Sequence, residues 1–332
     1  MHTPGNRTDV AFSCVLCGSS RNEIVVKGIK SHCGRIEERF DFRRCLDCAF
    51  VSLWPRPSES ELQRYYRFIQ GESENSLDSV GTSSRGSSPE NRCSGVSSPS
   101  HIWKYCRGLK SIWNWFTQPS FHAIRQYIAA GPPKSHVLDV GCGRGALMAY
   151  IADLASCVEG FDFDAAAVMQ CRRRGYKAQV ADLNTLTPTE KRFDFIVMRH
   201  VLEHIADPVA VLSNLRVGLR PNGRLILEVP NVNGFTSKLF KSNWNGWDPP
   251  FHLNQFSKET LTRVLLDAGY CISTITTLAT VDEFRRSFNL YLGGADNKHS
   301  LIRMSLVPFY LALQACGAGG ALLVQATARD GH

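Results

Sequence analysis

The sequence predicts a doubly wound α/β fold preceded by a small cysteine-bearing module. From residue 136 onward, short apolar runs alternate with amphipathic stretches, which is the pattern of parallel strands joined by helices. A glycine-rich turn, GCGRG at 141–145, follows the first apolar run, as expected where the backbone of such a sheet approaches a ligand. Two Cys-x-x-Cys pairs lie before residue 50, in a segment too short for a core of its own. These observations set the predicted architecture.

The elements are expected in the following order. A capping-box spacing of Ser58 and Glu61 starts a short helix that includes Tyr65 and Tyr66. Residues 101–130 return to aromatic and apolar content and predict one or two helices, broken near Pro119, that cover the sheet. The expected strands are 136–140, 157–162, 178–182, 193–200, 224–230 and 271–278. Helices are expected from Ala146, from Asp164, over 208–218 and over 257–268, the last with Ser257 as N-cap and Gly269 just after its end.

Length and composition limit the possible functions. The 332 residues have room for one large and one small domain, and 43% hydrophobic with 20% charged residues is typical of a globular protein. The net charge of +8 is spread along the chain, so it does not favour nucleic acid as a partner, although it suits an acidic substrate or a membrane surface. The first ten residues are polar and lack the apolar core of a secretion signal, so we expect a reducing, cytoplasmic location.

Three regions differ in composition. Residues 11–70 hold the cysteine pairs and the first helix. Residues 71–100 are rich in serine and glycine with almost nothing apolar, which predicts a disordered linker because such a segment cannot offset its ordering entropy. Residues 101–332 are expected to form the α/β domain.

An uncharged stretch near the C-terminus is long enough to cross a bilayer. It runs from Met304 to Ala328, but Pro308 and glycines within 317–320 interrupt it. We therefore expect a buried helix, a glycine turn and a final strand over 321–328. A segment that lies in a membrane interface, or that contacts a lipid-linked substrate, is the alternative.

The cysteine pairs, Cys14–Cys17 and Cys45–Cys48, predict a structural zinc site. Paired Cys-x-x-Cys turns place thiolates around a tetrahedral Zn²⁺, whose binding energy folds a small segment. His32 and Cys33 lie between the pairs and are alternative ligands. Redox chemistry is the other alternative, although it normally needs only one pair.

Asp139 distinguishes two cofactor classes at the glycine-rich turn. A dinucleotide fingerprint would need its third glycine one residue later than Gly145, and the pyrophosphate would be repelled by Asp139. S-adenosylmethionine (SAM) has no phosphate and carries a sulfonium and an ammonium, so a carboxylate suits it. The turn therefore favours SAM over NAD.

Further polar residues follow the later strands, at the edge where ligands of such folds bind. Asp162 ends the second strand and is placed to accept both ribose hydroxyls. Asp182 and Leu183 follow the third strand, where they would meet the amino group and the apolar face of adenine. Arg199 and His200 end the fourth strand at the same edge.

Five segments resemble, in order over about residues 136–280, the motifs of class I SAM-dependent methyltransferases: VLDVGCGRG, EGFDFD, ADLNTL, FDFIVMRHVLEHIADP and LRPNGRLILEVPN. The resemblance implies a Rossmann-like seven-stranded methyltransferase sheet that ends in an antiparallel hairpin, here 271–278 with 321–328. It also implies a cofactor site: Asp139, Gly141 and Gly143 for the methionine end, Asp162 for the ribose, Asp182 with Leu183 for adenine, and Arg199 beside them.

The cysteine segment, through RCLDCAFVSLWPRPSESELQRYY, resembles the N-terminal zinc-binding piece of a bacterial methyltransferase group. That group acts largely on sugars, polysaccharide precursors and other small metabolites. Its C-methyltransferase branch usually carries a further C-terminal domain, for which this chain is too short, so the resemblance favours O-methylation of a sugar or other small-molecule acceptor. The serine-rich insertion departs from the group's pattern.

Four residues are the candidate catalytic groups: His200, Glu203, His204 and His252. The first three share one face of an expected helix, and His252 comes from the loop after the fifth strand. Methyl transfer from a sulfonium requires that the acceptor be positioned and, for a hydroxyl, deprotonated. The four residues suit either a base with its orienting carboxylate or a divalent-metal site. Relatives with an ExxEH pattern bind Mg²⁺ here, and His200 replaces the first Glu of that pattern.

Trp244, Trp247 and Phe251 suggest an aromatic wall above the site, on which a sugar would stack, although such residues also build simple cores. Two other hypotheses remain open. The same fold would methylate RNA or protein, with the zinc module as a docking piece, or would be a non-catalytic scaffold. Asp139 and Asp162 argue against the scaffold, which needs neither.

Overall fold

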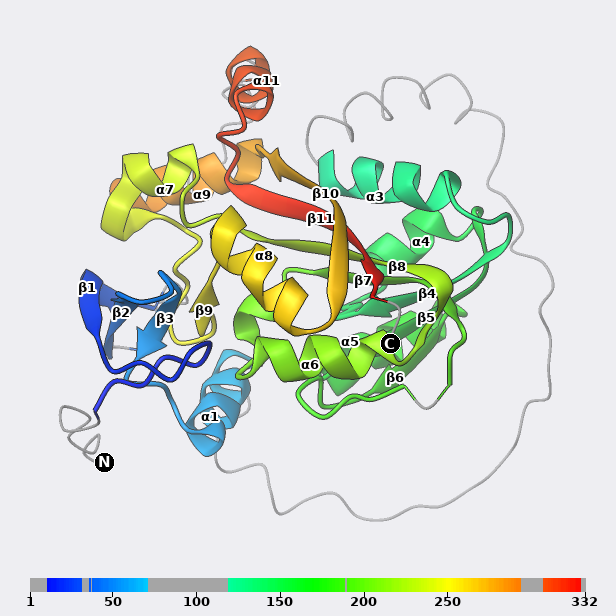
Figure 1. Ribbon diagram of the computed structural model, residues 1–332, viewed down its shortest axis with the longest axis horizontal. Helices are drawn as coiled ribbons and strands as arrows, with labels where there is room; N and C mark the ends of the chain where they lie inside the picture. Colours follow the sequence, from blue (N-terminus) through cyan, green and yellow to red (C-terminus); the bar gives the residue numbers. More distant parts are fainter. Residues whose placement is uncertain are drawn as a thin grey trace.

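The computed structural model describes residues 11–31, 36, 38–70, 119–188, 190–293 and 307–329 (Figure 1). Three of the sequence predictions fall outside these residues: the linker 71–100, the first part of the aromatic stretch 101–130, and the alternative ligands His32 and Cys33.

A seven-stranded sheet forms the centre of the molecule and confirms the predicted fold class. Its strand order is β10-β11-β8-β7-β4-β5-β6, with β4 to β8 parallel to one another and β11 antiparallel to both of its neighbours. The bounds of its strands are Ser135–Val140 (β4), Ala155–Asp162 (β5), Lys177–Val180 (β6), Phe193–Arg199 (β7), Leu219–Pro230 (β8), Tyr270–Leu278 (β10) and Ala321–Ala328 (β11). The hairpin expected from 271–278 and 321–328 is therefore present.

Helices cover both faces of this sheet. They are Pro119–Ala129 (α3), Ala146–Ile151 (α4), Ala165–Arg173 (α5), Pro208–Arg216 (α6) and Lys258–Asp267 (α8). Their starts follow the local sequence, since Asp164, Asp207 and Ser257 each accept a hydrogen bond from a backbone N–H of the first turn. Gly269 adopts a positive φ of 82° just after α8, as the helix-end pattern predicts.

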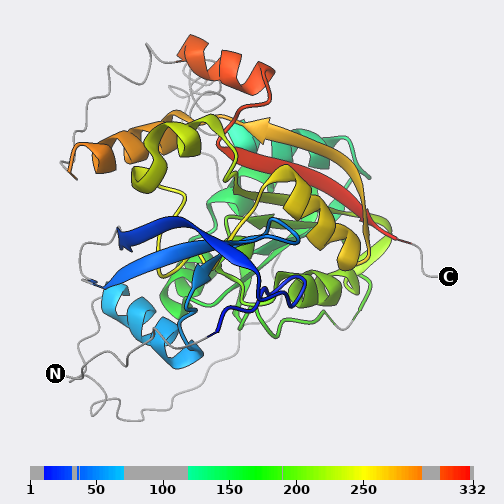
Figure 2. The ribbon, with the colours of Figure 1, turned by 60° about the vertical axis from the view of Figure 1, so that its left-hand side comes forward.

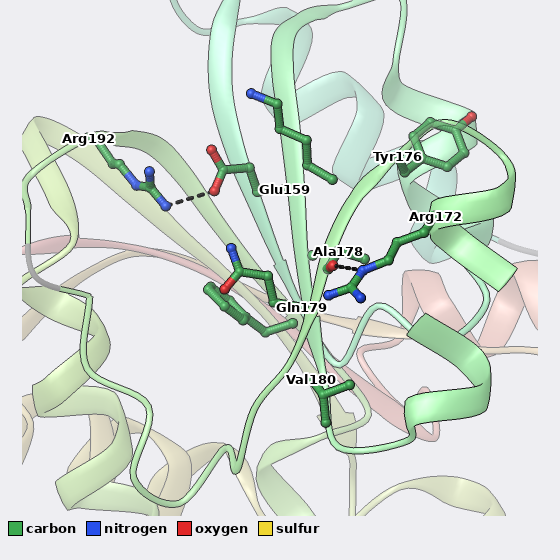
Figure 3. Close-up of a pocket in the computed structure, with 10 residues that line it drawn as sticks. Glu159, Arg172, Tyr176, Ala178, Gln179, Val180 and Arg192 are labelled. Carbon is green, nitrogen blue, oxygen red and sulfur yellow. Dashed lines mark hydrogen bonds and ion pairs between the residues drawn. The ribbon is translucent and has the colours of Figure 1, made fainter. Parts of the chain in front are cut away.

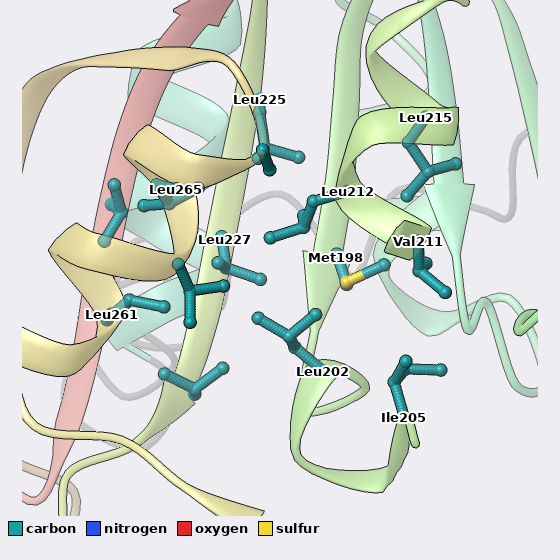
Figure 4. Packing of buried hydrophobic residues seen from close by; sticks show 14 of the residues in the cluster. Met198, Leu202, Ile205, Val211, Leu212, Leu215, Leu225, Leu227, Leu261 and Leu265 are labelled. Atoms are coloured by element: carbon teal, nitrogen blue, oxygen red, sulfur yellow. The ribbon is translucent and has the colours of Figure 1, made fainter. Parts of the chain in front are cut away.

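The main core lies between the sheet and helices α6 and α8 (Figure 4). Leu212 of α6 and Leu265 of α8 meet Leu225 and Leu227 of β8, and all four are fully buried. Burying a leucine side chain contributes about 1.5–3 kcal/mol, so this layer holds the strand ends of the candidate site in fixed positions.

A second, four-stranded sheet contains the N-terminal segment and one strand from the α/β domain. Its order is β1-β2-β3-β9, from Asn22–Lys30 (β1), Arg39–Cys45 (β2), Val51–Trp54 (β3) and Asn254–Gln255 (β9). Helix α1, Glu59–Gln70, follows, and the predicted cap is present because Ser58 N donates to a Glu61 carboxylate oxygen at 2.8 Å. Pairing of β3 with β9 fastens the N-terminal module beside the loop that carries His252 (Figure 2).

Three further helices lie beyond the end of β8: Phe235–Phe240 (α7), Val281–Tyr291 (α9) and Val307–Ala315 (α11), with the short 3-10 turn Lys241–Asn243 (η3) after α7. The prediction of a buried helix before the final strand is wrong, because Phe309, Ala312, Gln314 and Ala315 of α11 are exposed. Within the described ranges, no helix has both the length and the apolar character required to span a bilayer.

Candidate functional site

The glycine-rich turn joins β4 to α4 and depends on its glycines. Gly141 adopts a φ of 79°, and a Cβ atom there would lie 2.2 Å from Val201 Cγ2, so no side chain fits. Gly143 N donates to Asp162 Oδ2 at 2.7 Å. The turn and the end of β5 are thereby held together at the carboxyl edge of the sheet.

Asp139 lies immediately before this turn and is buried, with 2% of its surface exposed. Within the described part of the chain, its Oδ2 atom has no hydrogen-bond partner. Burial raises the pKa of Asp139 to about 7, helped by the charge of Asp162 and opposed by that of Arg199. A buried carboxylate oxygen without a hydrogen-bond partner is costly, and a bound cation would offset that cost.

Asp162 ends β5 as predicted, and its Oδ1 accepts from Asp164 N at 2.9 Å. A carboxylate accepts about four hydrogen bonds, so Asp162 retains acceptor sites after binding Gly143 and Asp164. Asp182 lies in an exposed turn, where Asn184 N donates to its Oδ1 at 2.9 Å. The side chain of Leu183 is buried in the main core, so it packs inside the domain and does not form an open apolar face.

Arg199 and Glu228 end the neighbouring strands β7 and β8 and form an ion pair of 2.6 Å between Nε and Oε2. Arg199 Nε also donates to Ser120 Oγ at 3.1 Å, and its guanidinium lies 4.7 Å from the ring centre of Phe121. Glu228 is fully buried and was missed in the sequence analysis. The signal in the sequence that could have indicated Glu228 was a charged residue inside the otherwise apolar strand RLILEVP.

His200 lies outside the helix in which it was expected, because it adopts a φ of 53° and only Leu202–His204 form a 3-10 turn. Its Nδ1 is 3.4 Å from Glu203 Oε1, and its Nε2 is 3.6 Å from Glu228 Oε1. Desolvation opposes its charge, but the two carboxylates outweigh it and raise the pKa of His200 to about 10. His200 is therefore expected to be cationic at neutral pH.

Glu203, His204 and His252 form a compact cluster, in which the potential ligand atoms all lie within 4.8 Å of one another. Glu203 is fully buried, and no hydrogen bond from the described residues satisfies either of its carboxylate oxygens. Burial would raise the pKa of Glu203, but the surrounding histidines outweigh burial and lower it to about 2. The cluster thus contains a buried anion with free acceptor capacity.

Both histidines of the cluster have the same ring nitrogen, Nδ1, next to a backbone carbonyl oxygen. His204 Nδ1 lies 3.1 Å from the Phe251 carbonyl oxygen, and His252 Nδ1 lies 2.7 Å from that of Gly246. A carbonyl only accepts, so each Nδ1 carries a hydrogen and donates it, which leaves the Nε2 lone pair available in the neutral ring. Burial and the charge of His252 lower the pKa of His204 to about 4, so its ring is neutral at pH 7.

Tyr66 joins this cluster from helix α1, far away in the sequence. Its hydroxyl lies 3.4 Å from His204 Nδ1, and its ring contacts those of Phe163 and Phe251 at centre distances of 4.8 and 5.1 Å. Tyr66 therefore links the loop after Asp162 to the loop before His252. Its position depends on docking of the N-terminal module, so no local pattern indicated it.

The predicted aromatic wall is part of a core. Trp244, Trp247 and Phe251 are at most 5% exposed and pack with Phe42 and other residues of the N-terminal sheet. The Trp244 indole donates to Glu283 Oε1 at 2.8 Å. These residues therefore shape the loop that carries His252 and offer no open stacking surface.

The four cysteines Cys14, Cys17, Cys45 and Cys48 converge as predicted, with sulfur–sulfur distances of 3.5 Å for Cys14–Cys48 and 3.6 Å for Cys17–Cys45. They are free thiols and not disulfides. Zinc–sulfur bonds of about 2.3 Å in a tetrahedron give sulfur–sulfur edges of about 3.8 Å. The four sulfur atoms therefore fit a tetrahedral metal ion.

A separate hollow lies along β5 and β6 at the edge of the sheet (Figure 3). Glu159 and Arg192 in its lining pair with each other at 2.7 Å, and Arg172 Nε donates to the Ala178 carbonyl. The predicted site residues are not among those that line it. Its charged lining is thus largely engaged in contacts within the protein.

Comparison with known proteins assigns the central part of the chain. Residues 116–274 match the model of a family described as "Methyltransferase domain". The chain is 26% identical over 189 residues to an uncharacterised protein of a Streptomyces fradiae transposon, covering 53% of this chain and 55% of that protein. It is 32% identical over 104 residues to the ubiquinone biosynthesis O-methyltransferase of Coxiella burnetii, covering 30% of this chain and 44% of that enzyme.

A "Probable S-adenosylmethionine-dependent methyltransferase" of Mycobacterium tuberculosis is 30% identical over 165 residues, covering 47% of this chain and 55% of that protein. The chain thus spans about half the length of the curated relatives it matches. Among solved structures, a SAM-dependent methyltransferase from Mesorhizobium loti superposes with a TM-score of 0.46 at 16% identity, covering 61% of this chain and 95% of that one. The chain is therefore similar to the methyltransferase domain family over residues 116–274, within which β4 to β8 form the parallel part of the sheet.

Proposed function

We propose that this protein is a SAM-dependent methyltransferase that methylates an oxygen atom of a sugar or other small molecule. The observation that carries the proposal is the buried carboxylate of Asp139 at the glycine-rich turn, whose Oδ2 atom has no hydrogen-bond partner among the described residues. A sulfonium or ammonium group would neutralise this carboxylate, whereas a pyrophosphate would be repelled by it. The SAM-dependent relatives support the same cofactor.

The cofactor would lie along the carboxyl edge of the sheet. Asp139, Gly141 and Gly143 would hold its methionine end, and Asp162 has the acceptor capacity to bind the ribose hydroxyls. Asp182 in its exposed turn would accept from the adenine amino group. When bound, SAM supplies an electrophilic methyl group, and the protein has to position and deprotonate the acceptor.

His252 is proposed as the base that removes the acceptor proton. Its Nδ1 is occupied by the Gly246 carbonyl, so its Nε2 lone pair is available. Glu203 Oε1 lies 4.0 Å from that Nε2 and would stabilise the imidazolium that forms when the proton arrives. Tyr66 and His204 would hold the two loops at a constant separation.

A second mechanism uses the same three side chains to bind a divalent cation. It is favoured by one specific observation: one ring nitrogen of each histidine and one carboxylate oxygen of Glu203 lie within 4.8 Å of one another, and each histidine is oriented through Nδ1 by a carbonyl, as metal-bound histidines are. A cation would draw the three ligand atoms to about 3 Å of one another. It would lower the pKa of a bound acceptor hydroxyl in place of a base.

The four N-terminal cysteines are proposed to bind structural Zn²⁺. The sulfur–sulfur distances support this, since they match the edges of a tetrahedron without a disulfide. Oxygen as the acceptor atom is supported by the name of the ubiquinone-pathway relative.

Calorimetry followed by a transfer assay tests the proposal. We expect SAM to bind and NAD not to bind, and labelled methyl groups to pass to nucleotide-sugar or glycan acceptors and not to RNA. Tight NAD binding without SAM binding would overturn the cofactor assignment. Transfer to RNA or protein alone would leave the proposed methyltransferase activity in place but would replace the proposed class of acceptor.

Divalent-metal dependence separates the two mechanisms. If His252 is the base, activity survives dialysis against a chelator once one equivalent of Zn²⁺ has been returned to the cysteine site, and Glu203→Gln lowers turnover. If a cation is bound, activity is lost on dialysis, is not restored by that Zn²⁺ alone, and returns with Mg²⁺ or Mn²⁺ in the native protein but not in Glu203→Gln.

A further inference from the structure

The uncharged stretch before the final strand forms an exposed helix that the methyltransferase site does not use. Helix α11 contains no charged residue, yet among its described side chains Phe309 is 39% exposed and Ala312 and Ala315 are also exposed. An apolar helix normally buries such residues. This exposure indicates a surface that has a use.

The exposed apolar residues of α7, α9 and α11 belong to one surface, here called the aromatic face. Its members are Leu239 (49% exposed), Phe288 (40%), Tyr291 (63%), Leu292 (51%) and Phe309 (39%). Figures 1 and 2 both place the three helices on the same side of the molecule. Large apolar side chains at this exposure, gathered on adjacent helices, are typical of interaction sites.

Ring contacts below the surface connect its members. The ring centre of Phe284 in α9 lies 6.2 Å from that of Phe288 and 6.5 Å from that of Phe309. The ring centre of Phe240 in α7 lies 5.0 Å from that of Phe284 and 6.4 Å from that of Tyr291. Phe240, which is buried, and Phe284, which is half-buried, thus support the exposed rings. The aromatic face is therefore continuous across the three helices.

The charges beside the aromatic face are basic. Lys238, next to Leu239 in α7, and Lys241, directly after α7, are exposed. The acidic residues in the described part of these helices are engaged: Asp282 lies 3.6 Å from Arg285, and Glu283 accepts from Trp244 and Thr236. Exposed cations next to exposed Phe, Tyr and Leu are the combination that binds anionic lipid surfaces.

We propose that the aromatic face attaches the protein peripherally to an anionic phospholipid bilayer. Tyr291 and Phe288 would enter the headgroup region, and Lys238 and Lys241 would contact lipid phosphates. A second copy of the chain fits less well, because a symmetric dimer through this face would bring the same cations against each other. The proposal concerns a surface outside the catalytic cluster, so it stands or falls independently of the proposed reaction.

Vesicle flotation tests the proposal with the full-length protein. We expect binding to vesicles that contain phosphatidylglycerol, weak binding to pure phosphatidylcholine, and loss of binding at high salt. The double charge reversal Lys238→Glu with Lys241→Glu should weaken partitioning by at least about tenfold, since each surface cation contributes roughly fivefold. Leu239→Ser with Tyr291→Ser should weaken it similarly on both vesicle types.

Matched controls are available elsewhere on the surface. Lys177→Glu with Lys191→Glu makes the same charge change on exposed residues of a different region, and Val180→Ser with Met169→Ser replaces equally exposed apolar residues. Both controls should bind vesicles as the native protein does. The proposal is overturned if the native protein stays unbound, if the face variants bind normally, or if they instead abolish a dimer seen by sedimentation.

Discussion

At the glycine-rich turn, we propose that the charge state of a single residue, Asp139, decides which cofactor binds. Its carboxylate is buried beside Asp162, and its pKa of about 7 means that it carries a full charge only above neutral pH. The same burial makes the charge effective, because water does not screen it. Asp139 is therefore proposed to sense both cofactor and pH.

SAM affinity should consequently depend on pH. Cationic SAM favours the ionised carboxylate, so affinity is full above pH 7 and falls as the pH drops through about 7, approaching tenfold per pH unit. Calorimetry across this range, in buffers of different ionisation enthalpy, should show proton release on binding at low pH. Asp139→Asn should bind weakly with a flat profile, and a native protein with a flat profile would contradict the assignment.

Two substitutions should separate binding from chemistry. Asp162→Ala removes acceptors for a ligand and for Gly143 N, so we expect SAM affinity to fall by at least about tenfold. His252→Ala should leave SAM affinity unchanged and reduce turnover by about 10²–10⁴-fold. Equal losses of SAM affinity in both variants would rule out the division of roles.

At the scale of elements, helix caps and strand ends position the site. Three of the helices next to the sheet start at residues whose side chains accept hydrogen bonds from backbone N–H groups of the first turn. These caps could be predicted from the sequence because they depend on residues close together in the chain. The helix expected to include His200 did not form as expected. The backbone turns at His200, which lets its ring reach both Glu203 and Glu228.

The capping box of α8 gives a stability prediction. Ser257 Oγ accepts from Thr260 N, and Thr260 Oγ1 accepts from Ser257 N, so Ser257→Ala should lower the free energy of unfolding by about 1 kcal/mol. Ser213→Ala is the control, because its hydroxyl only donates to a carbonyl, Val209 O, within helix α6. Denaturant unfolding of both variants measures the difference. A cost for Ser257→Ala no larger than for the control would refute the role of the cap.

For the whole molecule, the N-terminal module completes the candidate site. Its sheet includes β9 from the α/β domain. Arg56 donates a hydrogen bond of 2.8 Å to the carbonyl of Ala206, which follows Glu203 and His204 in the chain. Tyr66 then reaches His204. We therefore propose that a metal ion stabilises the small module, which lacks a large core, and that the folded module positions the residues of the candidate site.

Removing one thiolate should therefore affect both metal content and activity. We expect Cys17→Ser to lose the roughly one zinc per chain of the native protein and to lower turnover, because Tyr66 is no longer held against the cluster. Metal analysis and the transfer assay measure the two effects. Cys271→Ser and Cys316→Ser, which replace exposed cysteines elsewhere, should change neither. Full zinc content in Cys17→Ser would exclude the four-cysteine site.

The sequence by itself determined the α/β sheet, the glycine turn with Asp139 and Asp162, the cysteine pairs and the caps, because each depends on periodicity or on residues close together in the chain. Only the tertiary structure decided that Glu228 and Tyr66 belong to the site, that Trp244 is core, and that α11 is exposed. Those outcomes depend on which distant surfaces come into contact. An aromatic or acidic residue has the same local pattern whether it meets solvent, a core or a catalytic group, so packing alone distinguishes these cases.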